Sequence, residues 1–259
     1  MLNLTSPEGA YTFGFIQADG HLSKEKNRNS GKMRIELNAR DADILYKLEK
    51  IIPVKTTIST RTRDTNFKKD YSTITLSAYD LKFREFLNQN GIPYGKKHKT
   101  IEPPKIPHLQ IDYYRGLIDG DGSLGLTNDN RPFVSLNTSS MTLVENYLKF
   151  LKQELNHDMV SNPNKRDSTY NIILFDEIAQ SYARLLYYDG CLAMDRKIKS
   201  AEEIKNWNRT TKKRDYDVKA WTDEEDQFIQ IHEIKDSMEK LNRTEQSINM
   251  RLWRLSGIK

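Results

Sequence analysis

The sequence lacks the residues that stabilise small secreted or zinc-binding domains, since Cys191 is its only cysteine. A single thiol excludes an internal disulfide framework and every multi-cysteine zinc site. The five histidines are scattered without the spacing of metal ligands. No run of about 18 apolar residues is present for a membrane span, and the N-terminus lacks the basic start and apolar core of a secretory signal. We therefore expect an intracellular chain with no membrane partner.

The charge of the chain is moderate in total but uneven along its length. Its 259 residues hold 41 Lys and Arg against 36 Asp and Glu, a formal net charge of +5. Residues 1–103 carry +6, residues 104–205 carry −2 and residues 206–259 carry +1. A moderately basic chain suits a nucleic-acid partner, although many unrelated proteins carry the same charge. The length allows one large domain or a few small ones.

Two segments of the chain repeat each other, FGFIQADGHLS at 13–23 and YRGLIDGDGSLG at 114–125. A constant offset of 102 residues relates their glycines and aspartates, which are Gly14, Asp19 and Gly20 in the first copy and Gly116, Asp121 and Gly122 in the second. Self-similarity at a fixed spacing indicates a repeated structural unit.

The predicted elements follow the same order in both halves, as judged from apolar periodicity. In the first half we predict strands at 33–38, 54–61 and 71–79, a helix from Asp41 to before Pro53, and a helix at 81–90 closed by Gly91. In the second half we predict strand pairs near 123–138 and 157–175, a helix from Ser140, and a helix from Asp176 closed by Gly190. Each half therefore reads as helix, two strands, helix, two strands, helix, with the Pro-rich segment 101–110 as linker.

Each repeated segment is predicted to be a helix whose small residues fall four apart, at Ala10, Gly14 and Ala18 in one and Gly116 and Gly120 in the other. Such stripes let two helix backbones approach closely, so the two helices should pack on each other. Gly20 and Gly122 should close them in the left-handed conformation, which places Asp19 and Asp121 in the last turns. A carboxylate there opposes the helix dipole, and two neighbouring acids repel unless a cation is shared.

A β-hairpin turn or a calcium-binding loop fits these segments less well. A hairpin explains neither the upstream glycines nor the repeat. A calcium loop needs Gly and Glu where this chain has Leu124 and Asn130.

Both segments resemble the LAGLIDADG motif of homing endonucleases, and the chain resembles the single-chain branch of that family that carries two motifs. The resemblance covers residues 1 to about 205. It implies an α+β fold in which two pseudo-symmetric αββαββα halves, residues 1–103 and 104–205, form a DNA-binding saddle of two four-stranded sheets. Gln17 stands where the family has its first aspartate, at a position that is not the usual ligand.

The resemblance also implies a metal centre. Asp19 and Asp121, with the carbonyls of Ala18 and Gly120, would bind Mg²⁺ at the scissile phosphates, and Mn²⁺ or Ca²⁺ could replace it for binding. The family places a basic or polar residue near each cleavage centre, after signatures that GKKHKT (95–100) and MDRKIKS (194–200) resemble. The candidate catalytic lysines are Lys99 and Lys197, with Lys97 and Lys199 as alternates. A solvated surface lysine is an equally good interpretation of any one of them.

The resemblance further implies that one face of each sheet reads DNA. Arg pairs with guanine and Asn with adenine in the major groove, while Lys mainly contacts phosphates. Without the motifs, a basic strand face would be interpreted as a solvated surface. The candidates on or between predicted strands are Lys24, Arg28, Lys32, Arg34, Arg61, Arg63, Lys68, Lys69, Asn128, Arg131, Asn137, Lys165 and Arg166.

The C-terminal part of the chain is predicted to be a separate DNA-binding module. Residues 206–219 hold five basic and two acidic side chains, which predicts a linker along phosphates with Lys212, Lys213 and Arg214. Residues 220–259 resemble a Myb/SANT-like helix-turn-helix, since WTDEED opens the segment and RTEQSINMRLWRL looks like its recognition helix. The resemblance implies a small all-α domain with Trp221, Phe228 and Trp253 in its core. Its implied DNA contacts are Gln246, Asn249, Arg251 and Arg254. A packing bundle without a DNA role is the alternative.

These resemblances together imply a monomeric, site-specific homing endonuclease that makes a metal-dependent double-strand break in duplex DNA. The target site and the host are not specified by the residues. The alternatives are a transcription regulator or an RNA maturase on the same scaffold, or an unrelated α/β DNA-binding protein. Regulators derived from this fold tend to lose the acids, whereas a maturase could keep them and would bind RNA.

Overall fold

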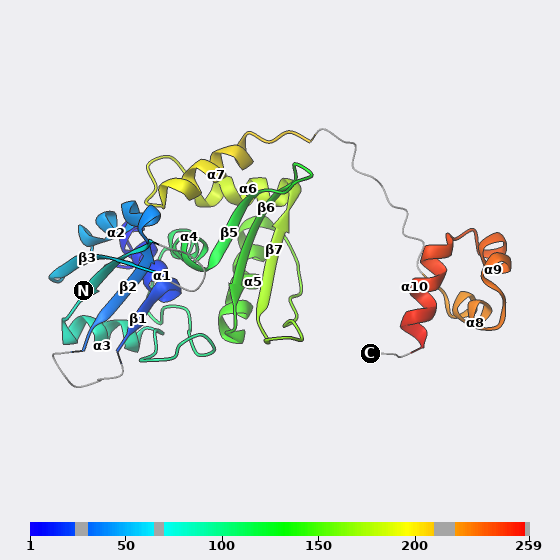
Figure 1. Ribbon diagram of the computed structural model, residues 1–259, viewed down its shortest axis with the longest axis horizontal. Helices are drawn as coiled ribbons and strands as arrows, with labels where there is room; N and C mark the ends of the chain where they lie inside the picture. Colours follow the sequence, from blue (N-terminus) through cyan, green and yellow to red (C-terminus); the bar gives the residue numbers. More distant parts are fainter. Residues whose placement is uncertain (24–30, 65–69, 210–220, 257–259) are drawn as a thin grey trace. The chain divides into compact units, whose positions relative to one another are not determined.

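The computed structural model describes residues 1–23, 31–64, 70–209 and 221–256. The chain divides into two compact units, Met1–Arg209 and Thr210–Lys259 (Figure 1). The larger unit combines helices with two antiparallel sheets, and the smaller unit is helical where it is described. The predicted α+β class is therefore confirmed. Within the described ranges, no helix is long and apolar enough to cross a membrane.

The first half of the larger unit places a four-stranded sheet beside the first motif helix. Alternate residues of its second strand, Met33 and Ile35, are buried and pair with Ala78 and Leu76. Because successive strand residues point to opposite faces, this register buries one face of the sheet. The strand order is β1-β2-β4-β3. The elements are α1 (Pro7–Asp19), β1 (Gly20–Leu22), β2 (Met33–Asn38), the 3-10 turn η1 (Ala39–Asp41), α2 (Ala42–Glu49), β3 (Thr56–Arg63), β4 (Tyr71–Ala78) and α3 (Leu81–Gln89).

The second half repeats this arrangement with a three-stranded sheet of order β5-β6-β7. Ser140 caps its long helix, since its side chain accepts a hydrogen bond from the Leu143 amide. The elements are α4 (Gln110–Asp121), β5 (Gly122–Leu126), β6 (Pro132–Thr138), α5 (Met141–Leu155), β7 (Tyr170–Phe175), α6 (Asp176–Leu186) and α7 (Asp195–Lys205).

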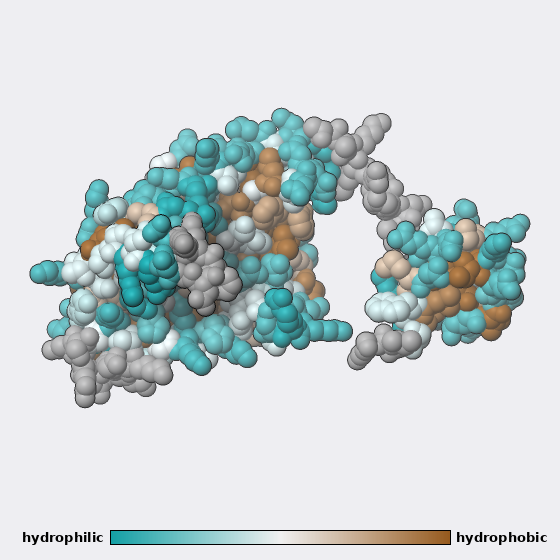
Figure 2. Space-filling view, viewed as in Figure 1, coloured by the Kyte–Doolittle hydropathy of each residue, from teal (hydrophilic) through white to brown (hydrophobic). Residues whose placement is uncertain are grey.

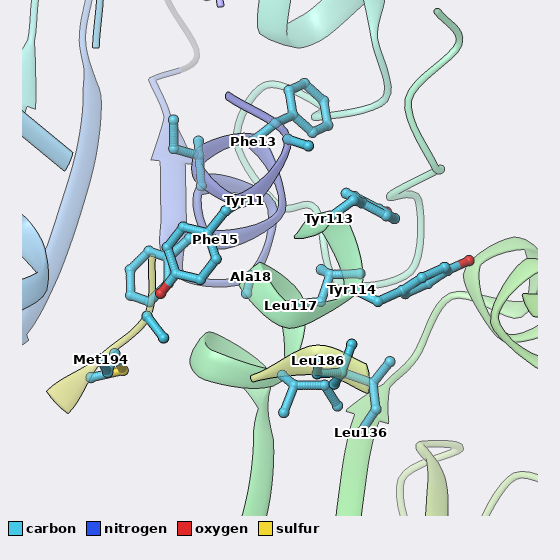
Figure 3. Packing of buried hydrophobic residues seen from close by; sticks show 14 of the residues in the cluster. Tyr11, Phe13, Phe15, Ala18, Tyr113, Tyr114, Leu117, Leu136, Leu186 and Met194 are labelled. Carbon is cyan, nitrogen blue, oxygen red and sulfur yellow. The ribbon is translucent and has the colours of Figure 1, made fainter. Parts of the chain in front are cut away.

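The two motif helices, α1 and α4, pack against each other inside the larger unit. A Cβ atom built on Gly14 would lie 2.2 Å from the carbonyl oxygen of Tyr113, and one built on Gly116 would lie 2.2 Å from that of Tyr11. The two contacts are related by the 102-residue offset, so the helices form a nearly symmetric pair. Aromatic and aliphatic side chains surround this contact (Figure 3). The predicted close packing of the small residues is confirmed.

The structure corrects the predicted conformation of the two motif glycines. Gly20 has φ −75° and Gly122 has φ −100°, so both are extended and begin strands β1 and β5 instead of closing the helices in the left-handed region. Their small size matters for a different reason. A Cβ on Gly20 would lie 2.4 Å from the Ile16 carbonyl oxygen, and one on Gly122 would lie 2.6 Å from that of Ser135.

The second sheet has three strands where four were predicted. Residues 157–168 form no strand, because their polar side chains bond to nearby backbone groups, which competes with strand pairing. The amide of Asp167 donates to the Asn164 side chain at 2.9 Å, and the amide of Ser168 donates to the Asn164 carbonyl at 3.1 Å. The helix from Asp176 also ends at Leu186, before the predicted Gly190. The predicted saddle is therefore unequal in its two halves.

Within residues 221–256 the smaller unit packs three helices, α8 (Asp223–Ile231), α9 (Ile234–Leu241) and α10 (Glu245–Leu255). A capping box between Thr222 and Glu225 begins α8. Arg243 pairs with Glu225 at 2.6 Å and lies over the Trp221 ring, while Ile229 and Ile248 are buried.

The prediction that Trp253 belongs to the core of this unit is wrong, since its side chain is 61% exposed. Buried Ile248 takes the inward-facing place on α10, and Trp253 lies five residues further along the helix. At about 100° per residue, five residues turn the side chain well away from the direction of Ile248. Figure 2 shows apolar colour on the viewed face of this unit.

We expect Gly116→Ala to destabilise the larger unit by about 1 to 3 kcal/mol or more, because the new methyl group would meet the Tyr11 backbone and overpack the helix contact. Urea unfolding followed by far-ultraviolet circular dichroism measures the change. Gly125→Ala is the matched control, since a Cβ there would meet only the Phe133 ring, at 3.7 Å. Equal losses of stability in the two variants would contradict the packing argument.

Candidate functional site

The two motif aspartates end the two packed helices, since Asp19 is the last residue of α1 and Asp121 the last residue of α4. The close packing brings their surroundings together: a Cβ built on Gly120 would lie 2.4 Å from the Ala18 Cβ and 3.1 Å from Asp19 Oδ2. The sequence therefore delivers one carboxylate from each half to a shared place, as the repeat predicts.

A pocket of about 240 Å³ opens beside these helix ends. Polar groups from both halves line it, so the pocket crosses the pseudo-symmetric boundary. The lining residues are Gln17, Ala18, Lys97, His98, Ile101, Asp121, Asn137, Thr138, Ser139 and Thr169.

Poor hydration disfavours the charged forms of both carboxyls, and the negative charge of Asp121 adds to this effect at Asp19. Burial, with a further contribution from the charge of Asp121, raises the pKa of Asp19 from 3.8 to about 6. Poor hydration also raises the pKa of Asp121, although the positive charge of Lys97 acts in the opposite direction. Two carboxylates held in this way gain from a neighbouring cation.

Two lysines supply positive charge at the helix ends. The Lys97 Nζ donates to the carbonyl oxygens of Gln17 at 2.5 Å and Ala18 at 2.6 Å. The Lys197 Nζ donates to those of Ile118 at 3.1 Å and Gly122 at 2.7 Å. Cations at the C-terminal end of a helix offset its dipole. Each lysine therefore closes the motif helix of its own half.

The lysine of the second half is the predicted one, whereas that of the first half is an alternate. Lys99 is exposed, and Lys97 reaches the end of α1 in its place. Lys199 is also exposed. Burial lowers the pKa of Lys97 and of Lys197 to about 8, against the raising influence of the nearby carboxylates.

The donor set suits a hard cation of the Mg²⁺ type. Such an ion binds through one or two carboxylates and completes its shell with water and substrate phosphate. Asp19 and Asp121 supply the carboxylates, while the predicted Ala18 ligand already accepts a hydrogen bond from Lys97. Among the residues that the structure describes, no group of three or more His, Cys, Asp and Glu side chains could hold a metal ion. The residues thus fit a metal that substrate helps to hold.

A scan against protein-family models and a search of curated proteins find no match to this chain. Solved structures do match. The homing endonuclease I-WcaI bound to its DNA recognition sequence is 16% identical with a TM-score of 0.51, covering 76% of this chain and 88% of that one. The meganuclease I-SmaMI bound to an uncleaveable DNA is 12% identical with a TM-score of 0.50, covering 78% and 90%. Full-length DUF199/WhiA from Thermatoga maritima is 16% identical with a TM-score of 0.49, covering 98% and 92%.

The two nuclease structures each match more than three quarters of the chain. The chain has a LAGLIDADG-like fold. At this level of identity the likeness concerns the fold, and the larger unit is called the LAGLIDADG-like unit from here on.

Among the predicted DNA contacts of the LAGLIDADG-like unit, some are exposed, Arg131 is paired with an acid and some lie outside the described residues. Arg131 forms a two-point ion pair with Asp176, at 3.0 and 2.8 Å. Asn137 is exposed on β6 and lines the pocket beside Asp121. Exposed or half-exposed side chains on and between strands are Lys32, Arg34, Arg61, Arg63, Asn128, Lys165 and Arg166. The predicted contacts Lys24, Arg28, Lys68 and Lys69 lie outside the described residues.

The contacts predicted for the C-terminal part divide in the same way. Gln246, Asn249 and Arg254 are exposed on α10. Arg251 instead forms a two-point ion pair, in which two guanidinium nitrogens donate to the two carboxylate oxygens of Asp226. Lys212, Lys213 and Arg214 lie outside the described residues.

The start of the predicted linker packs on the second half. The Trp207 indole donates to the Asn130 carbonyl at 2.7 Å, and Arg209 pairs with Glu177 at 2.6 Å. Residues up to Arg209 therefore belong to the LAGLIDADG-like unit.

The sequence reasoning missed a buried hydrogen-bond network behind the site. Tyr11 donates to Asp119 at 2.6 Å, and Tyr113 donates to Gln17. The signal was present, because a tyrosine stands three residues before the motif glycine in both copies. Because the two helices were predicted to be mostly apolar, no hydrogen bonds were expected from the hydroxyl groups of these tyrosines.

We expect Asp19→Asn to stabilise the LAGLIDADG-like unit at pH 7.5 without metal, by about 1 to 3 kcal/mol. The folded state raises the pKa of Asp19 to about 6, so the charged carboxylate costs stability above pH 6, and this cost fades as the pH falls towards the unfolded value near 3.8. The gain should therefore shrink at pH 4.5. Calorimetric unfolding in EDTA measures both, with the exposed Asp129→Asn as control. A loss of stability at pH 7.5 would contradict the expectation.

Proposed function

We propose that the LAGLIDADG-like unit binds a specific duplex DNA site across its two sheets and cuts both strands with Mg²⁺ held by Asp19 and Asp121. The observation that carries this proposal is the pair of carboxylates at the ends of two packed helices, where burial and the charge of Asp121 raise the pKa of Asp19 despite the nearby lysines, so that a bound cation would be stabilising. Two of the three solved structures named above are described as a homing endonuclease and a meganuclease bound to DNA, which supports the same proposal.

In the proposed reaction each half serves one strand. Asp19 and Asp121 would hold the metal through carboxylate oxygens, and the bound metal would supply charge stabilisation at the scissile phosphate and an activated water. Lys97 and Lys197 add positive charge beside the two acids. The pocket beside Asp121 gives room for water, and Asn137 and Ser139 offer polar groups to orient it.

Each unit offers its own proposed DNA-binding residues. Exposed Arg61 and Arg63 on β3 and Asn137 on β6 can reach base edges, while exposed lysines contact phosphates. Gln246, Asn249 and Arg254 on α10 offer a second reading surface that lengthens the site. Arg131 and Arg251 are less suited to contact DNA, because their guanidinium groups already pair with Asp176 and Asp226.

A second candidate function is sequence-specific DNA binding without cleavage, as in a transcription regulator. The hydrogen bond from Lys97 to the Ala18 carbonyl favours it, since an ammonium group there does what a metal would do for that oxygen. An RNA maturase on the same fold would instead bind structured RNA.

We expect Asp121→Asn and Asp19→Asn each to lower the cleavage rate by at least about 1000-fold, since each removes a metal ligand worth several kcal/mol in the transition state. DNA affinity should stay equal or rise slightly, because a negative charge leaves the phosphate path. A randomised duplex library incubated with Mg²⁺, with cut and bound fractions sequenced, measures both.

Discrete cutting by the native chain alone would support the nuclease and reveal its site. Enrichment of bound sequences without cutting by any variant would favour the regulator, and retention of RNA alone would favour the maturase. Unchanged cutting by either aspartate variant would overturn the assignment of these two acids.

A further inference from the structure

The residue two positions before each motif acid, Gln17 or Asp119, is buried and polar, although it is not one of the proposed metal ligands. Gln17 is 0% exposed and Asp119 is 1% exposed, and the 102-residue offset relates them. A buried polar side chain is costly unless its hydrogen bonds are made. Each therefore has partners that explain why it is there.

Gln17 ties together the two ends of the segment that carries Lys97. Its Nε2 donates to the carbonyl oxygens of Gly91 at 3.1 Å and Glu102 at 2.7 Å. The Glu102 amide also donates to the Gly91 carbonyl at 3.1 Å, which closes segment 91–102 into a loop. Lys97 lies within this loop and reaches back to the end of α1.

Asp119 fixes the segment that leads to Lys197. It accepts hydrogen bonds from the Tyr187 hydroxyl at 2.6 Å and from the Met194 amide at 2.8 Å. Met194 immediately precedes α7, whose first turn carries Lys197 to the end of α4. The segment from Tyr187 to Met194 is thus anchored at both ends by a single carboxylate.

We propose that Gln17 and Asp119 are positioning residues, each of which holds the lysine of its own half at the end of its motif helix. The inference rests on the proposed function only in its consequence for strand cleavage. The two anchors have opposite chemistry, because Gln17 donates to two carbonyls whereas Asp119 accepts from an amide and two hydroxyls. They are therefore not interchangeable, and each governs one half.

Lysine labelling tests the positioning without any need for cleavage. The full chain is treated with an amine-acetylating reagent, and the modification of Lys97 and Lys197 is followed by peptide mass spectrometry. Asp119→Leu, which removes the acceptors, should speed labelling of Lys197 by about tenfold and leave Lys97 within about twofold. Gln17→Met, which removes the donor, should do the reverse.

Variants of nearly the same size test whether the hydrogen bonds of the two side chains, and not only their volume, position the lysines. Asp119→Asn should restore protection of Lys197, because the amide oxygen can accept from Met194 and the amide nitrogen can donate to the Tyr187 hydroxyl. Gln17→Glu should not restore protection of Lys97, since its carboxylate would face two carbonyl oxygens. If Asp119→Leu does not fold, Tyr187→Phe removes one anchoring bond and should speed labelling of Lys197 alone by a smaller factor.

A general loss of stability has a different signature. Leu151→Ala removes packing from the buried face of α5 and should change the labelling of both lysines by similar factors. Equal exposure of both lysines in Asp119→Leu and in Gln17→Met would overturn the inference.

Strand-resolved cleavage of a duplex labelled differently at its two ends adds the functional consequence. Asp119→Leu and Gln17→Met should slow opposite strands, by about 10 to 100-fold, and accumulate complementary nicked products. Slowing of the same strand by both would overturn the inference. If the native chain does not cut, the proposed cleavage fails, while the labelling pattern still decides whether the two residues position the lysines.

Discussion

The close approach of the α1 and α4 backbones is the contact on which the rest of the structure depends. Neither Gly14 nor Gly116 leaves room for a Cβ, since the partner's carbonyl oxygen would lie 2.2 Å away. Two helices can come this close only where side chains are absent from the contact. The same closeness brings the ends of both helices, and with them Asp19 and Asp121, into one small region. The packing of the two helices therefore also fixes where the two acids of the site lie.

Hydrogen bonds that cross between the helices make the two halves depend on each other. Tyr11 of α1 donates to Asp119 of α4, and Tyr113 of α4 donates to Gln17 of α1. Each polar anchor thus receives one bond from the opposite helix and makes its other bonds within its own half. A shift of one helix along the other would weaken both anchors at once. Buried networks of this kind favour one relative placement of the packed elements over neighbouring ones.

The sequence alone predicts the repeat, the order of most elements and the place of both acids, because these depend on local periodicity and on one offset. Its failures have tertiary causes. The strand near 157–168 is lost to local hydrogen bonds around Asn164, which periodicity does not weigh. The predicted left-handed conformation of Gly20 and Gly122 is wrong. Glycine is needed at these two positions because a Cβ atom would clash with neighbouring backbone, not because φ is positive.

The choice between lysines was also beyond local pattern. Lys97 and Lys99 stand two residues apart in a polar segment. Which one reaches the end of α1 is set by the loop that Gln17 closes, and that loop depends on contacts 74 and 85 residues away in the chain. Lys197 was proposed from the family signature that residues 194–200 resemble, and it lies in the first turn of α7, a helix that the periodicity did not predict.

The lysines and the acids at the site have separate roles, which explains how two carboxylates can stand close together there. Lys97 and Lys197 direct their hydrogen bonds to backbone carbonyls at the helix ends, where they offset the negative ends of two dipoles. Their charge lowers the pKa of Asp19 through space, but burial and Asp121 still hold that pKa near 6. The folded protein therefore keeps an unfavourable charge on Asp19, and a local cost of this kind is common at ligand-binding sites. A divalent cation would relieve that cost, and the relief itself contributes to its binding.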